Sequence, residues 1–348
     1  MTRLRLAAWN IAWFADLFDR SDRLRLDATE SALPGVSRRR QAEAIATVLR
    51  AVDADLYAIL EAPNTGRRQS TVRALEGFAG RFSLRQRAAV IGQPSPTHQE
   101  IALLFDPGRL AARPLPIGRD VAAAEVLALF SKPPLEATVR DRCGGLTFHL
   151  VALHLKASEA VAVRAGAAGQ AARVRQQASV DKRRMQARWL RRRVISRLAE
   201  GAELVVLGDF NDGPGRGPDD PESSVQVVAG LADEDGPRLV CPWIGGDMED
   251  GEARPVTARF ADPAADREQA ALIDFILLSP GLAARTGPCW RVWAPAPFGD
   301  GADAFAEALR AASDHFPVTV DLHAAGAEEA GRKRQPPRGS SPSSSTLR

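Results

Sequence analysis

Cysteine is scarce in this chain: only Cys143, Cys241 and Cys289 occur in 348 residues, and no two of them form a CxxC pair. This odd, widely spaced set argues against a disulfide framework or a thiolate metal cluster, and it favours free thiols in a reducing compartment. No uninterrupted apolar run reaches the length of a membrane span. No signal peptide fits the N-terminus, where apolar and polar residues alternate as in a strand. We therefore expect a cytoplasmic protein without a membrane span.

An excess of charge of one sign is also missing. The 46 Lys and Arg residues against 43 Asp and Glu residues leave a formal net charge of +3, which is weak evidence for a polyanionic partner. Basic residues concentrate instead between Arg173 and Arg197, mostly within one predicted helix. This cluster fits a nucleic-acid contact and equally fits a solvated helix face. The composition implies no obligate protein partner.

The chain does have enough apolar residues, 45% of the total, to bury a large core. Strand-length apolar runs outnumber helical patterns, and their mixed order predicts an α/β fold with two sheets and helices outside them. We expect strands at residues 4–11, 56–60, 101–105, 135–140, 146–154, 204–207, 272–278 and 316–322, and helices around residues 42–49, 70–78 and 181–199.

Two segments between these elements carry weaker patterns. Residues 157–177 are rich in Ala and Arg and include two glycines, which predicts a mobile loop or a loose helix, and residues 288–297 are expected to form a loop. Because no internal repeat or linker interrupts the pattern, we expect a single domain over residues 1–323. Residues 324–348 have almost nothing to bury and are predicted to be a disordered tail.

Polar side chains follow several of the expected strands. Asp209 and Asn211 come directly after the apolar run at 204–207, and their i, i+2 spacing points both to the same side of an extended backbone. Four other segments share this design, namely Trp9 with Asn10, Leu60 with Glu61, His154 with Lys156, and Ser313 with Asp314 and His315. The pattern predicts one site built from strand ends at one edge of a sheet core.

Taken in order, these segments, together with Ile273 and Asp274, resemble the endonuclease/exonuclease/phosphatase superfamily. That superfamily includes pancreatic-type deoxyribonucleases, abasic-site endonucleases, neutral sphingomyelinases and inositol-polyphosphate 5-phosphatases. The GDFN segment at 208–211 and the SDH segment at 313–315 are specific in combination, and the matches run from Trp9 to about Leu322. The resemblance implies a four-layer sandwich of two mixed β-sheets packed face to face with helices outside, together with divalent-cation dependence and phosphoester hydrolysis.

A phosphodiester repels nucleophiles through its own negative charge, so a cation and hydrogen-bond donors must offset the charge that builds in the transition state. Glu61 is the expected Mg²⁺ ligand because hard cations prefer carboxylate oxygen, with Mn²⁺ as an alternative metal. Asn10 offers either an oxygen to the cation or a donor to the phosphate. The resemblance adds Asp314 as a metal ligand.

His315 is the candidate general base, with Asp274 holding its other ring nitrogen. Asp209 is expected to orient the attacking water, and Asn211 to donate to a nonbridging phosphate oxygen. His154 is expected to donate to the phosphate or to protonate the leaving oxygen. The resemblance to pancreatic-type deoxyribonucleases further suggests that Glu100 pairs with His154.

Three basic residues are candidate phosphate binders. Lys132 stands where the deoxyribonuclease-like pattern carries Arg, and a lysine lacks the bidentate fork of a guanidinium. Lys156 follows His154 closely and would add positive potential. Arg173 belongs to the 157–177 segment, which would lie beside the site and could select the substrate.

These residues predict a cation-dependent phosphodiesterase, with a nucleic acid as the first substrate class. The alternative is a phosphoesterase that acts on a phospholipid or a small phosphorylated molecule, for which Trp13 with Phe14, or residues 295–298, would supply an exposed apolar loop. A binding module without catalysis is disfavoured, because it would have no need for the complete polar set. The sequence leaves open DNA versus RNA and endo- versus exonucleolytic cleavage.

Overall fold

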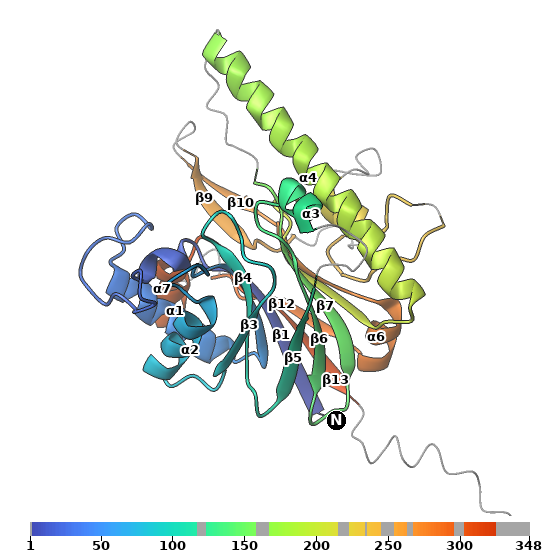
Figure 1. Ribbon diagram of the computed structural model, residues 1–348, viewed down its shortest axis with the longest axis horizontal. Coiled ribbons are helices and arrows are strands. Elements are labelled where there is room, and N and C mark those ends of the chain that lie inside the picture. Colours follow the sequence, from blue (N-terminus) through green and yellow to red (C-terminus); the bar gives the residue numbers. More distant parts are fainter. Residues whose placement is uncertain are drawn as a thin grey trace, which may run out of the picture.

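The computed structural model describes residues 2–116, 123–157, 167–214, 223–233, 235–244, 254–262, 267–295 and 303–324. Two mixed β-sheets pack face to face, and helices cover their outer faces, as Figure 1 shows. This arrangement is the predicted α/β sandwich. No helix within the described ranges combines the length and apolar character needed to cross a membrane.

The first sheet has six strands and the second has five. The first runs in the order β12 (Cys289–Val292), β13 (Val318–Ala324), β1 (Thr2–Asn10), β2 (Leu56–Ala62), β4 (Glu100–Phe105) and β3 (Ala88–Ile91). The second runs in the order β11 (Asp274–Leu278), β8 (Leu204–Asp209), β7 (Thr147–His154), β6 (Leu135–Asp141) and β5 (Leu110–Leu115). β9 (Ala258–Asp262) and β10 (Arg267–Ala271) form a separate antiparallel pair.

Each sheet contains one parallel pair, and those pairs are central to the site. β1 runs parallel to β2, and β7 runs parallel to β8, whereas the other neighbouring strands of the two sheets are antiparallel. Parallel neighbours place their carboxyl ends at the same edge. The last residues of β1 and β2 therefore meet, as do those of β7 and β8.

The core between the sheets follows from period-2 alternation in the strands. In β1, Leu4, Leu6 and Ala8 are buried between the sheets, while Ala7 and Trp9 join the cluster beneath the helices on the other face. Strands buried on both faces read as nearly continuous apolar runs, which explains the pattern at 204–207. The fold thus has three apolar layers between its four structural layers.

Helices close both outer faces. α1 (Arg38–Val52), α2 (Thr71–Arg81) and α7 (Ala304–Ala312) pack on the first sheet, and α3 (Ala123–Leu129), α4 (Ala167–Ala199) and α5 (Ser224–Ala229) pack on the second. The short η1 (Phe14–Leu17) follows β1, and α6 (Pro280–Thr286) follows β11. Ser37 and Ser70 cap α1 and α2 by accepting backbone amides in the first turn.

Two expectations are corrected by the structure. α4 begins at Ala167, well before the expected start at residue 181, because Ala and Arg are strong helix formers that outweigh an isolated glycine. Residues 167–177 thus agree with the helical one of the two alternatives for segment 157–177, and residues 158–166 lie outside the described ranges. The expected loop at 288–297 contains β12, which gains its hydrogen bonds by pairing with the edge of β13. β13 includes Ala324, and the predicted tail from residue 325 onward lies outside the described ranges.

Candidate active site

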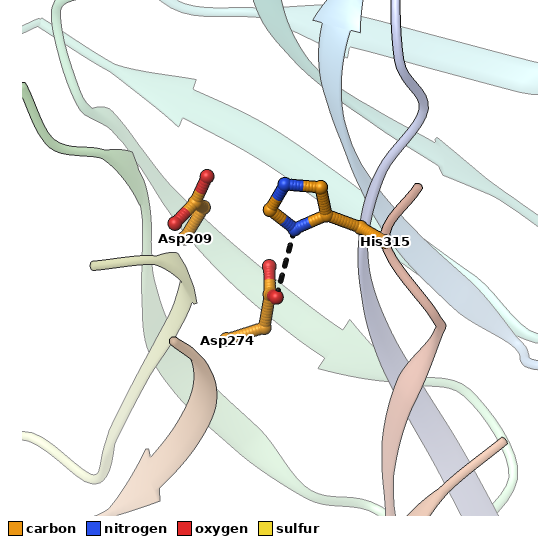
Figure 2. Close-up of side chains that lie close together, drawn as sticks. All are labelled: Asp209, Asp274 and His315. Carbon is orange, nitrogen blue, oxygen red and sulfur yellow. Dashed lines mark hydrogen bonds and ion pairs between the residues drawn. The ribbon is translucent and has the colours of Figure 1, made fainter. Parts of the chain in front are cut away.

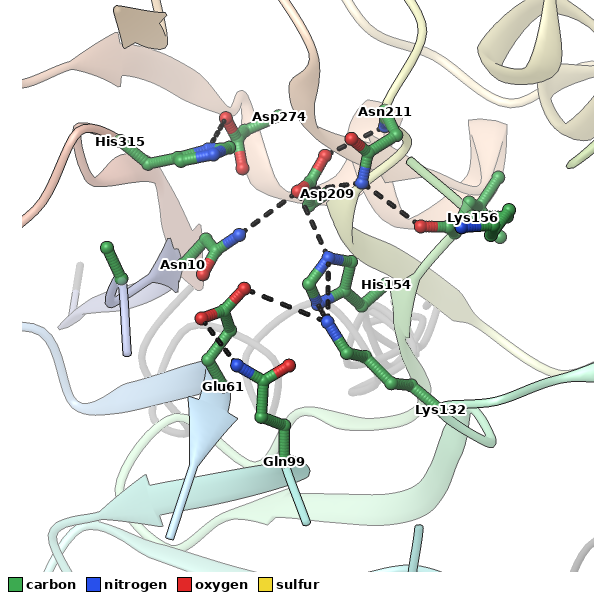
Figure 3. A network of polar contacts seen from close by, with 12 residues as sticks. Asn10, Glu61, Gln99, Lys132, His154, Lys156, Asp209, Asn211, Asp274 and His315 are labelled. Atoms are coloured by element: carbon green, nitrogen blue, oxygen red, sulfur yellow. Dashed lines mark hydrogen bonds and ion pairs between the residues drawn. The ribbon is translucent and has the colours of Figure 1, made fainter. Parts of the chain in front are cut away.

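The predicted site residues converge at the strand ends of both sheets (Figure 3). Asn10 ends β1, and Glu61 lies next to the end of the parallel strand β2. Across the second sheet, His154 pairs with Asp209, and Asp209 pairs with Asp274 on β11. His315 lies three residues before the start of β13. Residues more than 300 positions apart in the sequence therefore face one another.

Gly208 allows β8 to approach β7 closely enough to place Asp209. Its φ angle is +138°, and a Cβ atom at this position would lie 2.0 Å from the carbonyl oxygen of Leu153. Any side chain would collide with that strand, and L-residues rarely adopt such a backbone conformation. The glycine of the GDFN segment is therefore a packing requirement of the site.

The Glu61 carboxylate accepts hydrogen bonds at one oxygen and faces an ammonium group at the other. Its Oε2 accepts hydrogen bonds from the backbone amide of Trp13 and from Nε2 of Gln99, each at 2.9 Å. Its Oε1 lies 3.7 Å from Nζ of Lys132. Glu61 also has a left-handed φ of 57° at a register shift between β2 and β4. Strained backbone of this kind concentrates at functional sites.

The side-chain oxygen of Asn10 indicates whether a cation fits beside Glu61. Its Nδ2 donates to Oδ2 of Asp209 at 3.1 Å. Its Oδ1 is buried and has no hydrogen-bond partner among the described residues. A buried oxygen without a donor is costly unless another group compensates it. Because this oxygen lies on the strand next to Glu61, the two residues offer the oxygen ligands that a hard cation prefers.

His315 and Asp274 form a buried pair. Nδ1 of His315 lies 2.9 Å from Oδ2 of Asp274, which leaves Nε2 for another partner. Figure 2 shows this pair beside Asp209. Burial alone would lower the pKa of His315, but Asp274, Asp209 and Asp314 raise it to about 10. Burial and the nearby charge of Asp274 raise the pKa of Asp209 to about 7.

Asp209, Asp274 and His315 also form a second group that could hold a metal ion. Their potential ligand atoms all lie within 4.8 Å of one another. One of those contacts is already the hydrogen bond between His315 and Asp274. The group therefore resembles an oriented imidazole more closely than it resembles an open metal site.

His154 lies on the opposite side of Asp209, beside a cation. Its two ring nitrogens are 3.2 and 3.4 Å from Nζ of Lys132, and its Nε2 is 3.5 Å from Oδ2 of Asp209. Burial, followed by the charges of Lys132 and His315, holds the pKa of His154 well below its usual range. Burial also lowers the pKa of Lys132, against the opposing effect of Glu61 and Asp209.

Asn211 supports Asp209 in this structure. Its backbone amide donates to Oδ1 of Asp209 at 2.8 Å, and its Nδ2 donates to Oδ2 of Asp209 at 3.1 Å and to the carbonyl oxygen of Leu155 at 3.0 Å. Its left-handed φ of 51° makes this turn possible, which asparagine tolerates better than most residues. The expected contact of Asn211 with a phosphate stays a prediction.

Glu100 and Arg173 were expected in the site but do not contact the other site residues, and the predicted pair of Glu100 with His154 is wrong. Glu100 does not contact His154, because its two carboxylate oxygens accept the backbone amides of Thr65 and Ser95. Successive residues of a strand point to opposite faces, so the neighbouring Gln99 reaches Glu61 instead. Arg173 is exposed on the N-terminal part of α4, which extends beyond the sheets in Figure 1.

The remaining predicted residues lie near the group. Lys156 is close enough to Lys132 for its charge to lower the pKa of that ammonium, and its backbone amide donates to Gln186. Asp314 lies beside Ser313 Oγ at 3.4 Å, and its charge contributes to the raised pKa of His315. Sequence reasoning missed Gln99 and the backbone amide of Trp13, since neither carries a motif; only the position of Gln99 next to Glu100 could have drawn attention to it.

Comparisons with known proteins agree with this geometry. The family model of the endonuclease/exonuclease/phosphatase family matches residues 7–315. The chain is similar to a crystal structure of D. rerio TDP2 complexed with single strand DNA product, with a TM-score of 0.51, 14% identity, and coverage of 93% of this chain and 100% of that one. Truncated TDP2 from Caenorhabditis elegans gives a TM-score of 0.50 at 14% identity, covering 92% and 98% of the two chains.

An endonuclease/exonuclease/phosphatase from Bacteroides vulgatus gives a TM-score of 0.50 at 16% identity, covering 93% of this chain and 100% of that one. A search of curated proteins found no match. At such low identities the solved structures show a shared fold, while the family model spans most of the chain and includes the strand-end residues. The chain therefore belongs to the endonuclease/exonuclease/phosphatase family, which supports its assignment as a phosphoric ester hydrolase.

Proposed function

We propose that this protein is a divalent-cation-dependent phosphodiesterase whose substrate is a nucleic acid. The observation that carries the proposal is the meeting of two different polar groups at one edge of the sandwich. The Asn10 and Glu61 oxygens suit a cation, and the buried His315–Asp274 pair suits proton transfer. Family membership supports the chemistry, and the D. rerio TDP2 neighbour is itself complexed with a single strand DNA product.

The proposed metal ligands are Glu61, Asn10 and Asp314. Glu61 would contribute Oε1 and Asn10 its buried Oδ1, and Asp314 would add a second carboxylate from the segment before β13. Mg²⁺ suits these oxygen ligands, and Mn²⁺ is the alternative. When bound, such a cation offsets negative charge on the phosphate.

The protein's own groups would supply the proton transfers. In its neutral form, His315 would accept a proton from water at Nε2, while Asp274 fixes the ring and stabilises the imidazolium that forms. Asp209 lies between the two histidines and would orient that water. On the other side, His154 and Lys132 would donate to the phosphate or to the leaving oxygen, with Lys156 and Asn211 adding positive potential and a further donor.

A substrate panel with a matched inactive variant tests the proposal. Wild-type protein and His315→Ala would be assayed with Mg²⁺ on supercoiled DNA, single-stranded DNA, RNA, a sphingomyelin-type lipid and an inositol phosphate. We expect wild-type cleavage of nucleic acid and a loss of roughly a thousandfold or more in the variant. Turnover of only the lipid or the small ester would reject the nucleic-acid substrate, and equal activity of the two proteins would reject His315 as the base.

A metal titration tests the ligand assignment separately. Glu61→Gln keeps the size of the side chain but removes the negative charge, so the Mg²⁺ concentration needed for half-maximal rate should rise by about tenfold or more. Glu100→Gln is the matched control, because the Glu100 carboxylate accepts the backbone amides of Thr65 and Ser95 and has no hydrogen bond to the proposed cation ligands among the described residues. An unchanged titration in Glu61→Gln would remove Glu61 from the metal site.

A further inference from the structure

Trp13 differs from the other tryptophans of this protein. The chain has six, and five of them are buried or packed against the apolar clusters, namely Trp9, Trp189, Trp243, Trp290 and Trp293. Trp13 is 50% exposed, and its indole has no ring contact or hydrogen bond with any described residue. Among the six tryptophans, Trp13 therefore leaves the most indole surface open to a ligand.

The backbone of Trp13 is tied to the proposed cation ligand Glu61. Trp13 has a left-handed φ of 55°, which is unfavourable for a bulky residue, and its amide donates to Oε2 of Glu61 at 2.9 Å. The following residue, Phe14, is buried and anchors the turn through edge contacts with Phe18 and Phe78. The fold therefore maintains a strained turn whose backbone contacts Glu61 and whose tryptophan ring is half exposed.

We propose that Trp13 is the stacking platform for a nucleobase adjacent to the scissile phosphate. This inference rests on the proposed function. It adds that the nucleotides next to the scissile phosphate are unpaired and single-stranded when they bind. A base in a duplex is already stacked on its neighbours, whereas an unstacked base offers a free face to an indole. Stacking is tolerant of sequence, so Trp13 would increase affinity without selecting a particular base.

The surface next to Trp13 has room for the continuing strand. A polar cavity of about 470 Å³ adjoins the turn, because Ala15 and Asp16 line it, and Asp16 donates its amide to the carbonyl oxygen of Trp13. Asn64 and His98, which follow Glu61 and precede Gln99, line another wall. Arg20, Arg25 and Arg38 also line the cavity together with Asp16, Asp19 and Glu30, so the cavity carries charges of both signs, and Arg38 is paired with Asp27.

The same turn argues against insertion into a membrane. A membrane-binding loop needs several exposed apolar side chains, but Phe14, Leu17 and Phe18 around Trp13 are all buried. The polar residues Asp16, Asp19 and Arg20 lie next to them. Residues 296–298 of the other expected apolar loop lie outside the described ranges. A single exposed indole among charges fits a base better than a lipid surface.

Paired substrates test the stacking role. Once the cleaved bond of a single-stranded oligodeoxynucleotide is mapped, the same strand is prepared with a tetrahydrofuran abasic residue on either side of that bond. Trp13→Ala should raise KM for the intact strand by about tenfold with little change in kcat, and should have no such effect on the abasic strand. Trp13→Phe should retain most of the affinity, and Ile195→Ala, an exposed apolar residue on α4, should behave as wild type.

Equal loss on the intact and abasic strands would overturn the proposal. A higher Mg²⁺ requirement in Trp13→Ala on both strands would show instead that the residue acts only by holding Glu61.

A binding measurement in EDTA makes the inference independent of turnover. Titration with a short single-stranded oligodeoxynucleotide should quench tryptophan fluorescence in the wild type, and the quenching should be largely lost in Trp13→Phe. If the wild type cleaves no nucleic acid but shows this quenching, the proposed activity fails while the stacking role holds. No Trp13-dependent quenching overturns the stacking role. A Trp13-dependent blue shift with phosphatidylcholine–phosphatidylserine vesicles, and none with DNA, would assign the residue to a membrane surface.

Discussion

The two histidines of the site are both buried, yet they lie in regions of opposite charge. His315 contacts Asp274 and lies near Asp209 and Asp314, and its pKa is raised to about 10. His154 contacts Lys132, and its pKa is held well below the usual range by burial and that cation. The same side chain at the same depth is thus driven toward opposite protonation states, and the neighbours decide which.

The difference suggests a division of labour between the two sheet edges. The β11 and β13 side stabilises the protonated imidazolium of His315, so the proposed base must lose this proton before it can accept one from water. The β7 side gathers His154, Lys132 and Lys156, which suits a site that receives the negative phosphate. Asp209 lies between them, bonded to Asn10 and Asn211 and close to His154.

Removing the Asp274 carboxylate from the β11 and β13 side should have the largest effect on activity. Asp274→Asn keeps the shape but no longer stabilises the imidazolium and can impose the wrong ring tautomer. We expect kcat to fall by roughly a thousandfold to ten-thousandfold, as for a triad carboxylate. The measurement is steady-state turnover of the best substrate in the panel, with thermal unfolding as a check on folding. A loss of less than about tenfold would mean that His315 does not depend on Asp274.

Disrupting the close contact between β7 and β8 at Gly208 should mainly affect stability. Gly208→Ala places a methyl group against the carbonyl oxygen of Leu153 at a backbone conformation that alanine rarely adopts. Such a clash, in a buried strand, should lower the free energy of unfolding by about 4 kcal/mol or more. Denaturant unfolding measures it. Gly145→Ala is the matched control, since Gly145 also has a positive φ but has open space around its Cβ position.

Glu136, a buried carboxylate outside the site, has a pKa shifted in the opposite direction to that of Asp209. Burial alone would raise the pKa of Glu136, but hydrogen bonds from His149, Arg193 and Arg197 outweigh it and bring that pKa to about 2. In Asp209, burial and the charge of a neighbouring carboxylate act in the opposite direction. Glu136 also anchors α4 to β6, so part of the basic helix is structural.

The sign of the pH effect follows from that lowered pKa. Because the folded pKa of Glu136 lies below its unfolded value of 4.5, its stabilisation is present above pH 4.5 and is lost as pH falls toward 2. We expect Glu136→Gln to remove about 3 kcal/mol of that stability near neutral pH and to flatten the acid limb of the stability curve. Urea unfolding at several pH values tests this, and parallel curves for both proteins would contradict it.

Weakening the cationic side should have the smallest effect. Lys132→Met keeps the apolar stem but removes the ammonium beside His154 and Glu61, so kcat/KM should fall by about tenfold to a hundredfold. Lys132→Arg should recover part of the loss because it restores a positive donor. The measurement is the ratio of kcat/KM between Lys132→Arg and Lys132→Met on the same substrate. If Met and Arg behave alike, the charge of Lys132 does not contribute to catalysis.

Much of the architecture could be predicted because it is local. Apolar alternation and helical spacing gave most strands and helices, and Asn10, Glu61, His154, Asp209 and His315 each follow or precede a strand-length apolar run. β12 escaped prediction because it is short and gains its hydrogen bonds from the edge of β13. The start of α4 could not be fixed, because the glycines at 166 and 169 favour a loop while the surrounding alanines favour a helix.

The sequence by itself determined which residue types stand at the strand ends, and with them the chemistry available to the site. Only the tertiary structure decided how they pair. Glu100 turns to backbone amides while Gln99 reaches Glu61, because a shift of one residue in a strand reverses the direction of the side chain. The opposite pKa shifts of His154 and His315 likewise arise from contacts between distant segments, since electrostatic interactions depend on separation and burial in space.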